Sequence, residues 1–325
     1  MSDLILQTFD IKKYFPLKKG LFSKNNGILK AIDGVSIKIH KGKTLGLVGE
    51  SGCGKSTLAR ILLMLLKPTE GKVYFKDSDI TKIKGENLKL LRKKMQVIFQ
   101  DPYSSLNPKL TVNSMLSEII KYHKIAEGKN VELKIIELLD KVGLRKNDSR
   151  KYPHEFSGGQ RQRICIARAL SLEPEFIICD EPLSALDLSV QAQIINLLID
   201  LQKDLGLTYL FISHDLSVVK HICDNICIMY LGKIVEEAVS EEIFVRPRHP
   251  YTEALLTSVL DPFQKRSVMS EYIKDFSLPA KNLSSGCNYE PKCIKAFSEC
   301  SKISPELQSV DNHKVSCLLY KNKTS

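Results

Sequence analysis

Short apolar runs bounded by polar and glycine-rich stretches alternate with helical patterns along most of the chain. Strand-like runs occur at residues 4–6, 35–39, 44–48, 71–75, 95–99, 176–179 and 209–213. Helical periodicity is found at 58–66, across 111–145, from about 158 to 170 and at 189–205. Buried apolar strands alternating with helices predict an α/β fold with parallel strands. The runs at 4–6 and 35–39 instead flank a glycine- and lysine-rich hairpin around 18–27.

The pattern changes near residue 246, after which long periodic elements are scarce. A chain of 325 residues can bury a large core and leave residues for something smaller. We therefore predict one large domain over residues 1–245, with a helical subdomain at about 101–175, and a separate C-terminal region over 246–325.

A glycine-rich run, G-E-S-G-C-G-K-S-T, lies between the strand at 44–48 and the helix at 58–66. Its glycines allow successive backbone N–H groups to curl around β- and γ-phosphates at the positive end of the helix. Lys55 would supply a charge between the phosphates, and the Ser56 hydroxyl a ligand for Mg²⁺. The predicted nucleotide contacts are Gly49, Ser51, Gly52, Cys53, Gly54, Lys55, Ser56 and Thr57. The alternative is a glycine-rich turn that carries a lysine by chance.

Three predicted strands end in polar residues, and ligands of parallel sheets bind at the carboxyl ends of the strands. Asp180 is suited to holding Mg²⁺ through water, and Glu181 to polarising an attacking water. Gln100 is suited to contacting Mg²⁺ or that water, and His214 to contacting a γ-phosphate. Taken singly, each of these residues more often belongs to a solvated turn or surface.

The helix predicted from about residue 158 offers a second anion-ready terminus. Ser157 can cap it, and the glycine pair Gly158–Gly159 leaves its first N–H groups uncovered. The alternative is an ordinary cap with glycines for close packing. Near the N-terminus an exposed aromatic, Tyr14 or its neighbour Phe15, is a candidate for stacking on an adenine ring, and an ordinary core aromatic is the alternative.

Net charge and hydropathy narrow the class of protein. The formal charge of +11 suits nucleic acid, anionic lipid or no charged partner at all, because lysines are spread without a dense block. The N-terminus lacks the features of a signal peptide, and no apolar run approaches the roughly 18 residues that span a bilayer. We expect a soluble protein or one held at a membrane by partners. Buried reduced thiols are expected at Cys53, Cys165, Cys179, Cys223 and Cys227.

Five elements together resemble the ATP-binding cassette (ABC) family over roughly residues 4–245. They are G-E-S-G-C-G-K-S-T, Q-D-P at 100–102, F-S-G-G-Q at 156–160, the I-I-C-D-E strand end followed by S-A-L-D at 184–187, and S-H-D at 213–215. The resemblance implies a P-loop core of the RecA type, with an antiparallel β subdomain and a helical subdomain. It implies an ATPase in which two cassettes enclose ATP and hydrolysis releases them.

The resemblance also implies roles for single residues. Tyr14 looks like the adenine-stacking aromatic, Gln100 the sensing glutamine, Glu181 the general base and His214 the γ-phosphate switch. Mg²⁺ would be held by Ser56, Gln100 and Asp180. The signature that caps the nucleotide of the opposite subunit would be Ser157, Gly158, Gly159 and Gln160, with Asp187 in the neighbouring loop.

A narrower resemblance points to the ATPase subunits of oligopeptide and dipeptide importers, of the F-type rather than the D-type. It rests on K-Y-F-P at 13–16, I-F-Q-D-P-Y-S-S-L-N-P at 98–108 and R-H-P-Y-T at 248–252. It implies a paired cassette of the D-type, two membrane permease subunits, an extracytoplasmic solute-binding protein and attachment to the cytoplasmic face of the cell membrane. Relatives that move nickel or other small solutes leave the cargo open.

The C-terminal region carries cysteines in the pattern C-x₅-C-x₆-C-x₁₆-C: Cys287, Cys293, Cys300 and Cys317. Four cysteines in a short, loop-rich stretch favour a metal or cluster over disulfides. The pattern resembles the C-terminal motif of the importer ATPases, which implies a [4Fe–4S] cluster, although Ile294 stands where proline is usual. Zinc or free thiols are the alternatives, and His313 is expected to be structural.

Two other classes of function compete with the importer ATPase. One is a soluble ABC ATPase acting on nucleic acid or ribosomes, supported mainly by the charge. Against it, the chain has one cassette and no coiled-coil insertion, so no nucleic acid is expected as a partner. The other is a redox-responsive binding module built on the cysteines, which the intact Lys55, Glu181 and His214 argue against.

Overall fold

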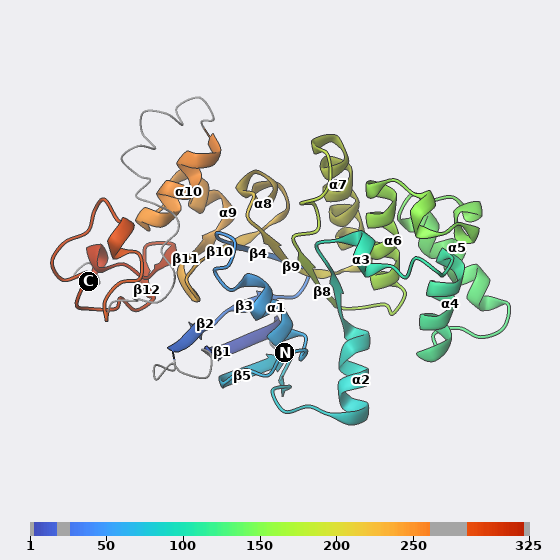
Figure 1. Ribbon diagram of the computed structural model, residues 1–325, viewed down its shortest axis with the longest axis horizontal. Coiled ribbons are helices and arrows are strands. Elements are labelled where there is room, and N and C mark those ends of the chain that lie inside the picture. The colour runs from blue at the N-terminus through green and yellow to red at the C-terminus, as the bar shows by residue number, and fades with distance from the viewer. Residues whose placement is uncertain (1–2, 18–26, 261–284, 322–325) are drawn as a thin grey trace, which may run out of the picture. The chain divides into compact units, whose positions relative to one another are not determined.

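The computed structural model describes residues 3–17, 27–260 and 285–321 (Figure 1). The chain forms two compact units. Unit 1 comprises Met1–Ile5, Ile39–Thr44 and Lys82–Ile212, and unit 2 comprises Leu6–Lys38, Leu45–Thr81 and Ser213–Ser325. Most of the hairpin expected around 18–27 lies outside the described residues.

Unit 1 is built on three neighbouring parallel strands in the order β9 (Thr208–Ser213), β8 (Phe176–Asp180) and β7 (Met95–Ile98). Cys179 of β8 is in register with Ile98 on one side and with Phe211 on the other. The apolar runs predicted as buried parallel strands are confirmed. Because the strands are parallel and in register, their carboxyl ends meet at one edge of the sheet, and the polar residues that follow β7 and β8 lie there.

Helices make up most of the rest of unit 1. They are α2 (Gly85–Lys94), α3 (Pro102–Ser105), α4 (Val112–Tyr122), α5 (Asn130–Lys141), α6 (Gly158–Leu170) and α7 (Leu188–Leu205), with the 3₁₀ turns η1 (Lys146–Arg150) and η2 (Pro153–Glu155). The helical pattern across 111–145 belongs to two helices, α4 and α5, which pack against each other and against η1 (Figure 1). The Thr111 hydroxyl caps α4 by accepting from the Ser114 N–H at 3.2 Å.

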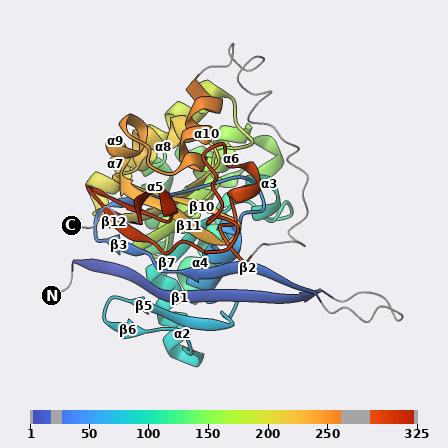
Figure 2. The same cartoon turned by 90° about the vertical axis from the view of Figure 1, so that its left-hand side faces the viewer.

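Unit 2 contains an antiparallel sheet in the order β2 (Gly27–Val35), β1 (Leu4–Leu17), β5 (Glu70–Phe75) and β6 (Ser78–Asp79). Figure 2 shows β1 and β2 as a long ribbon. The strand predicted at 4–6 continues to residue 17, and the one predicted at 35–39 is replaced by β2 and the short β3 (Lys38–His40). The pairing of β1 with β2 shifts register at Ile11/Lys12 and again at Lys13/Tyr14. Each shift interrupts the alternation of apolar and polar residues along β1, so the sequence pattern did not reveal the full length of the strand.

A second group of strands in unit 2 runs in the order β12 (Gln308–Val310), β13 (His313–Val315), β11 (Lys233–Val239), β10 (Asn225–Tyr230) and β4 (Thr44–Val48). β4 is parallel to β10, and the other pairs are antiparallel. The last strands of the chain therefore extend the same sheet that carries β4. Two short 3₁₀ turns, η5 (Glu290–Lys292) and η6 (Leu318–Tyr320), lie in the described stretch 285–321.

In the described residues of unit 2 there are also four helices: α1 (Lys55–Leu62), α8 (Leu216–Ile222), α9 (Ser240–Val245) and α10 (Pro250–Leu260). α8 packs against both α9 and α10. The expectation of few periodic elements beyond residue 246 is wrong at α10, which is 11 residues long. No helix in the described part of the chain has the length and apolar character needed to cross a membrane.

Candidate functional site

The phosphate-loop sequence lies between β4 and α1, as expected. α1 begins at Lys55, three residues before the predicted start, with Gly54 as its N-cap residue. Lys55, Ser56 and Thr57 therefore form the first turn of the helix, where backbone N–H groups have no partner within the helix. The loop and the helix start thus combine backbone N–H groups of a first helical turn, the helix dipole and a lysine, which suits a bound phosphate.

Two glycines of the loop are required by close backbone approaches. A Cβ added at Gly49 would lie 2.2 Å from the Met229 carbonyl oxygen of β10. A Cβ at Gly54 would lie 2.4 Å from the Ala31 carbonyl oxygen of β2, and Gly54 also has φ +115°. The Gly232 N–H adds a hydrogen bond to the Cys53 carbonyl at 2.9 Å. The loop is therefore held by backbone from β2, β10 and the turn after β10.

The Lys55 side chain lies inside this loop. It is 4% exposed, and its Nζ donates to the carbonyl oxygens of Gly49 at 2.7 Å and Glu50 at 2.9 Å. The neighbouring Cys53 is buried, and burial raises the pKa of its thiol. Lys55 thus places a positive charge among the loop residues, where an anionic group would be attracted.

In unit 1 the residues after β7 and β8 come together as the sequence predicted. Gln100 Nε2 donates to Glu181 Oε2 at 3.2 Å, although 81 positions separate the two residues. Glu181 has φ +48°, and its N–H donates to the Ile212 carbonyl of β9 at 3.0 Å. A positive φ in a residue other than glycine is uncommon, and here it directs the chain out of the sheet immediately after Asp180.

The start of α6 in unit 1 has a cap of the expected kind. The Ser157 hydroxyl accepts from the Gln160 N–H at 3.3 Å, and Gln160 Oε1 accepts from the Ser157 N–H at 3.0 Å. A Cβ at Gly159 would lie 2.5 Å from Val190 Cγ1 of α7, so close helix packing also requires a glycine there. Ser157, Gly158 and Gln160 are exposed, as is Asp187 at the N-cap of α7.

Two other predicted nucleotide contacts lie in unit 2. His214 follows β9 directly and is exposed. Tyr14 on β1 is half-buried, donates its hydroxyl to Asp33 Oδ1 at 2.5 Å and has Lys30 Nζ 5.5 Å from its ring centre. Burial and the bond to Asp33 raise the pKa of Tyr14 to about 12, so its hydroxyl stays protonated. The role of each in nucleotide binding stays a prediction.

The four C-terminal cysteines lie around one pocket in unit 2. Cys287, Cys293, Cys300 and Cys317 all line it, together with His249 and Tyr289. The Cys287 N–H donates to the Cys300 carbonyl at 2.7 Å, and burial raises the pKa of the Cys317 thiol to about 11. Nevertheless, no group of three or more His, Cys, Asp or Glu side chains among the residues that the structure describes is arranged to hold a metal ion. The predicted [4Fe–4S] site is therefore not supported by this arrangement of side chains.

The other cysteines conform to expectation. Cys53, Cys165, Cys179, Cys223 and Cys227 are free and buried. Burial raises the pKa of the thiols at Cys165, Cys179 and Cys227, so they are protonated and unreactive at neutral pH.

Comparison with known proteins identifies the family. The model of the ABC transporter family matches residues 32–184, and the model of the oligopeptide/dipeptide transporter C-terminal region matches 235–300. The chain is 50% identical to the oligopeptide transport ATP-binding protein AppF of Bacillus subtilis, over 98% of each chain. It is 46% identical to the dipeptide transport ATP-binding protein DppF of Escherichia coli, over 96% of this chain and 93% of that one. The chain belongs to the ATP-binding subunits of oligopeptide/dipeptide ABC transporters.

Solved structures place this ATP-binding subunit among P-loop ABC cassettes. The cassette cbiO1 of Clostridium perfringens, part of an ABC transporter complex, aligns with a TM-score of 0.65 at 26% identity, over 75% of this chain and 92% of that one. The ATP-binding cassette MJ0796, solved as a dimer with ADP and Pi bound, aligns with a TM-score of 0.63 at 30% identity, over 72% and 98%. The predicted α/β cassette fold is confirmed, and the subunit is an ATPase of this class.

Sequence reasoning missed two residues, Tyr251 and Glu236, which lie near the phosphate loop or near the pocket lined by the four C-terminal cysteines, here called the thiol pocket. Tyr251 accepts a hydrogen bond from the Glu50 N–H of the loop at 3.1 Å. Glu236 is fully buried and accepts from His313 Nδ1 at 2.8 Å, a contact in keeping with the structural role expected for His313. Tyr251 appeared in the sequence analysis only as part of the R-H-P-Y-T motif, and nothing in the sequence indicated that it, rather than a neighbouring residue, contacts the phosphate loop.

Proposed function

We propose that this subunit binds and hydrolyses ATP as one of two facing cassettes, and that the resulting closure and release power the import of oligopeptides or dipeptides. The likeness to peptide transport ATP-binding proteins over almost the whole chain supports this most strongly. Neither cassette would enclose a nucleotide alone, so the dimer would be a bistable element that ATP holds closed and hydrolysis releases. Nickel or another small solute is the alternative cargo.

The proposed contacts of the nucleotide divide into binding and catalytic groups. Phosphates would be held by the loop residues Gly49, Ser51, Gly52, Cys53, Gly54, Lys55, Ser56 and Thr57, the adenine by Tyr14, and the opposite nucleotide by Ser157, Gly158, Gly159, Gln160 and Asp187. The hydroxyl of Ser56, the amide oxygen of Gln100 and the carboxylate of Asp180 are oxygen donors of the kind Mg²⁺ prefers, so this donor set fits that ion. The ion, when bound, would neutralise charge on the phosphates.

In the proposed reaction Glu181 accepts a proton from the attacking water and His214 contacts the γ-phosphate. The bond from Gln100 Nε2 to Glu181 Oε2 supports this assignment, because it orients the carboxylate at the carboxyl edge of the sheet. Lys55 would offset charge that develops on the transferred phosphoryl group. Positioning and charge stabilisation would then carry most of the rate enhancement.

The proposed assembly contains a second ATPase subunit of the D-type, two transmembrane permease subunits and an extracytoplasmic solute-binding protein, and it sits at the cytoplasmic face of the cell membrane. Residues 1–245, with their helical part at about 101–175, would form the nucleotide-binding domain, and 246–325 the extension typical of peptide transporters. The match of a separate family model to residues 235–300 supports such an extension. Co-purification with integral membrane subunits, rather than with RNA or ribosomes, tests the assembly.

For the extension we propose that Cys287, Cys293, Cys300 and Cys317 bind a [4Fe–4S] cluster, with zinc as the alternative. Their common pocket and thiolate chemistry support this, whereas the positions of their side chains do not form a ligand set. Binding would have to displace the thiol protons, since ligation requires thiolates. Iron and zinc analysis of anaerobically purified protein decides between cluster, zinc and free thiols.

The substitution Glu181→Gln in the assembled transporter tests the proposed chemistry. We expect ATP turnover to fall about 10³-fold, in the range for loss of a general base, while ATP binding persists. Glu155→Gln, at an exposed residue of unit 1 outside the site, is the control and should leave turnover unchanged. Unaltered turnover with Glu181→Gln would refute the assignment of the base.

The paired-cassette mechanism has its own test. Replacing Ser157 and Gly158 in every subunit should abolish turnover while each subunit still binds ATP at its own phosphate loop. Full-speed hydrolysis by that assembly would refute the proposal that a second cassette completes the site.

A further inference from the structure

The start of α10 touches the phosphate loop through one side chain. Tyr251 is the second residue of α10 and is 2% exposed. Its hydroxyl oxygen accepts a hydrogen bond from the backbone N–H of Glu50 at 3.1 Å, across 201 positions of sequence. Glu50 is the second residue of the loop, and its carbonyl is also a partner of Lys55 Nζ.

This hydrogen bond is made to the first part of the loop, directly after β4. The Glu50 carbonyl and the Gly49 carbonyl both accept from Lys55, so the peptide planes around Glu50 set where the ammonium group lies. The N–H of Glu50 and the carbonyl of Gly49 belong to the same planar peptide unit. A partner that fixes the Glu50 N–H therefore also fixes the Gly49 carbonyl that holds Lys55.

The Tyr251 ring is itself held from several sides. Its centre lies 4.6 Å from that of Tyr230 on β10 and 5.4 Å from that of Tyr289, which also lines the thiol pocket. The Tyr251 N–H donates to His249 Nδ1 at 3.0 Å, so His249 caps α10. Burial lowers the pKa of His249 to about 4, so its ring is neutral and Nδ1 is free to accept.

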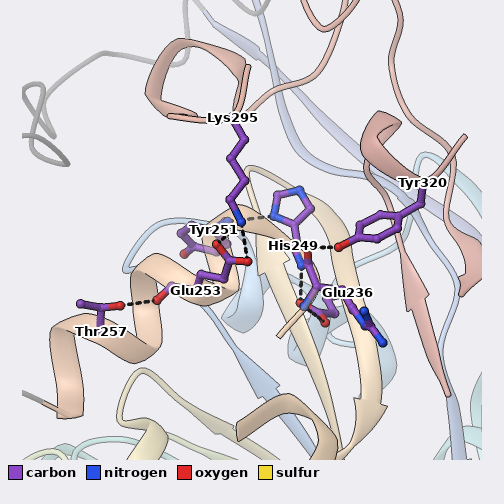
Figure 3. A network of polar contacts seen from close by, with 8 residues as sticks. Glu236, His249, Tyr251, Glu253, Thr257, Lys295 and Tyr320 are labelled. Carbon is purple, nitrogen blue, oxygen red and sulfur yellow. Dashed lines mark hydrogen bonds and ion pairs between the residues drawn. The ribbon is translucent and has the colours of Figure 1, made fainter. Parts of the chain in front are cut away.

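The turn that leads into Tyr251 is fixed by a buried carboxylate. Glu236 accepts from the N–H groups of Arg248 at 2.8 Å and His249 at 2.9 Å (Figure 3). It also accepts from His313 Nδ1 at 2.8 Å. The phenol oxygen is thus located by β10, β11, β13 and the thiol-pocket segment together. A hydroxyl with so little freedom can impose one orientation on a flexible glycine-rich loop.

We propose that Tyr251 is a positioning residue for the phosphate loop, through which the C-terminal region of unit 2 keeps the loop in the conformation that receives ATP. It acts through the Glu50 N–H and the peptide plane shared with Gly49, and the inference rests on the proposed nucleotide site. Without the phenol oxygen the loop samples more conformations, and ATP must order it on binding, which weakens affinity. Once ATP is bound its phosphates hold the loop, so the rate of hydrolysis changes little.

The test compares Tyr251→Phe with a matched hydroxyl deletion, Tyr320→Phe. Tyr320 donates to the Arg248 carbonyl at 3.0 Å, so that variant also loses one phenol hydrogen bond of the same network but none to the loop. Tyr251→Phe should raise KM for ATP of the assembled transporter about fivefold, the factor typical of one net hydrogen bond, with kcat within about twofold. Tyr320→Phe should leave both constants unchanged, while the two variants lower Tm by similar amounts.

The outcomes separate this inference from the proposed site. If Tyr251→Phe leaves KM equal to that of Tyr320→Phe while Lys55→Ala abolishes ATP binding by the full-length subunit, the nucleotide site stands and the role of Tyr251 is wrong. If Lys55→Ala also binds ATP normally, the proposed site itself fails. A fall in kcat at unchanged KM would contradict positioning by the ground-state loop and would likewise overturn the inference.

Discussion

The phosphate loop and the C-terminal region are both parts of unit 2, but they are held together in different ways. Several contacts of the loop are made between backbone atoms, such as the bond from Gly232 N–H to the Cys53 carbonyl at 2.9 Å and the close approach of Gly49 to the Met229 carbonyl. The C-terminal region is joined to β11 by a buried carboxylate–imidazole pair, Glu236 and His313, 77 positions apart. Backbone packing tolerates almost any side chain nearby, whereas a buried ionisable pair depends on two particular residues.

The difference implies two kinds of failure. A defect in the loop should remove ATP binding and leave the unit folded, because the strands around it remain paired. A defect at Glu236 should destabilise the unit, because several buried donors then lose their acceptor. Four substitutions test this contrast, and we take them in order of decreasing expected effect.

Glu236→Ala should have the largest effect on stability. The carboxylate is 0% exposed and accepts from two backbone N–H groups and from His313, so its removal takes the acceptor from two buried donors and one part-buried donor. Breaking a buried pair of this kind costs about 3–5 kcal/mol of unfolding free energy. Urea denaturation measures it. The control is Glu237→Ala on the same strand, since the Glu237 side chain accepts from the half-exposed Lys314 at 2.8 Å, so this variant should cost less than Glu236→Ala. Equal losses in the two variants would refute the contrast.

His249 should make the C-terminal region sensitive to acid. Burial lowers its pKa from 6.5 to about 4 in the folded protein, so the unfolded chain binds more protons between these pH values. Stability is therefore fully present above about pH 6.5 and falls as the pH drops towards 4, by up to about 3 kcal/mol from this group. His249→Asn can still cap α10 but cannot titrate, so it should flatten this part of the profile. A variant with the same acid dependence as the natural chain would exclude His249 as its source.

Gly49→Ala tests the backbone packing of the loop. The new Cβ would lie 2.2 Å from the Met229 carbonyl oxygen, so the loop must move away from β10. We expect ATP affinity of the full-length subunit to fall about 100-fold, comparable to the loss of a key phosphate contact, with circular dichroism unchanged. Gly42→Ala is the control: Gly42 has φ +71° and nothing within 4 Å of an added Cβ, so it brings strain without a clash outside the loop. If Gly42→Ala weakened ATP binding as much, general strain rather than the Met229 contact would explain the result.

The same contrast explains which parts of the structure the sequence predicted. The loop, the cap at Ser157 and the strand ends at Gln100 and Glu181 are local patterns, in which neighbouring residues determine the backbone. The meeting of Gln100 with Glu181 followed from the rule that parallel strands share a carboxyl edge. These features needed no knowledge of distant side chains.

The C-terminal region could not be predicted in this way. The partnership of Glu236 with His313 depends on β13 pairing with β11, which no short pattern encodes. α10 was missed although a signal existed, since proline at its first position is typical of a helix start. Histidine is not among the common capping residues, so the sequence did not predict that His249 caps α10. The spacing of the cysteines suggested that they lie together, and all four line one pocket. The spacing did not predict how their side chains are arranged in that pocket.

Asp311→Asn should have the smallest effect and so mark the lower end of the comparison. Asp311 forms an ion pair with Arg248 at 2.6 Å, next to the Glu236 network, but its side chain is 68% exposed. Exposed pairs contribute about 0–1 kcal/mol because water and salt screen them. We expect a change in unfolding free energy below about 0.5 kcal/mol at 0.15 M salt, measured by urea denaturation, and a smaller one at 1 M salt. A loss close to that of Glu236→Ala would mean that Arg248 needs its carboxylate partner to hold the turn before α10, and that burial is not what separates strong from weak contacts in this region.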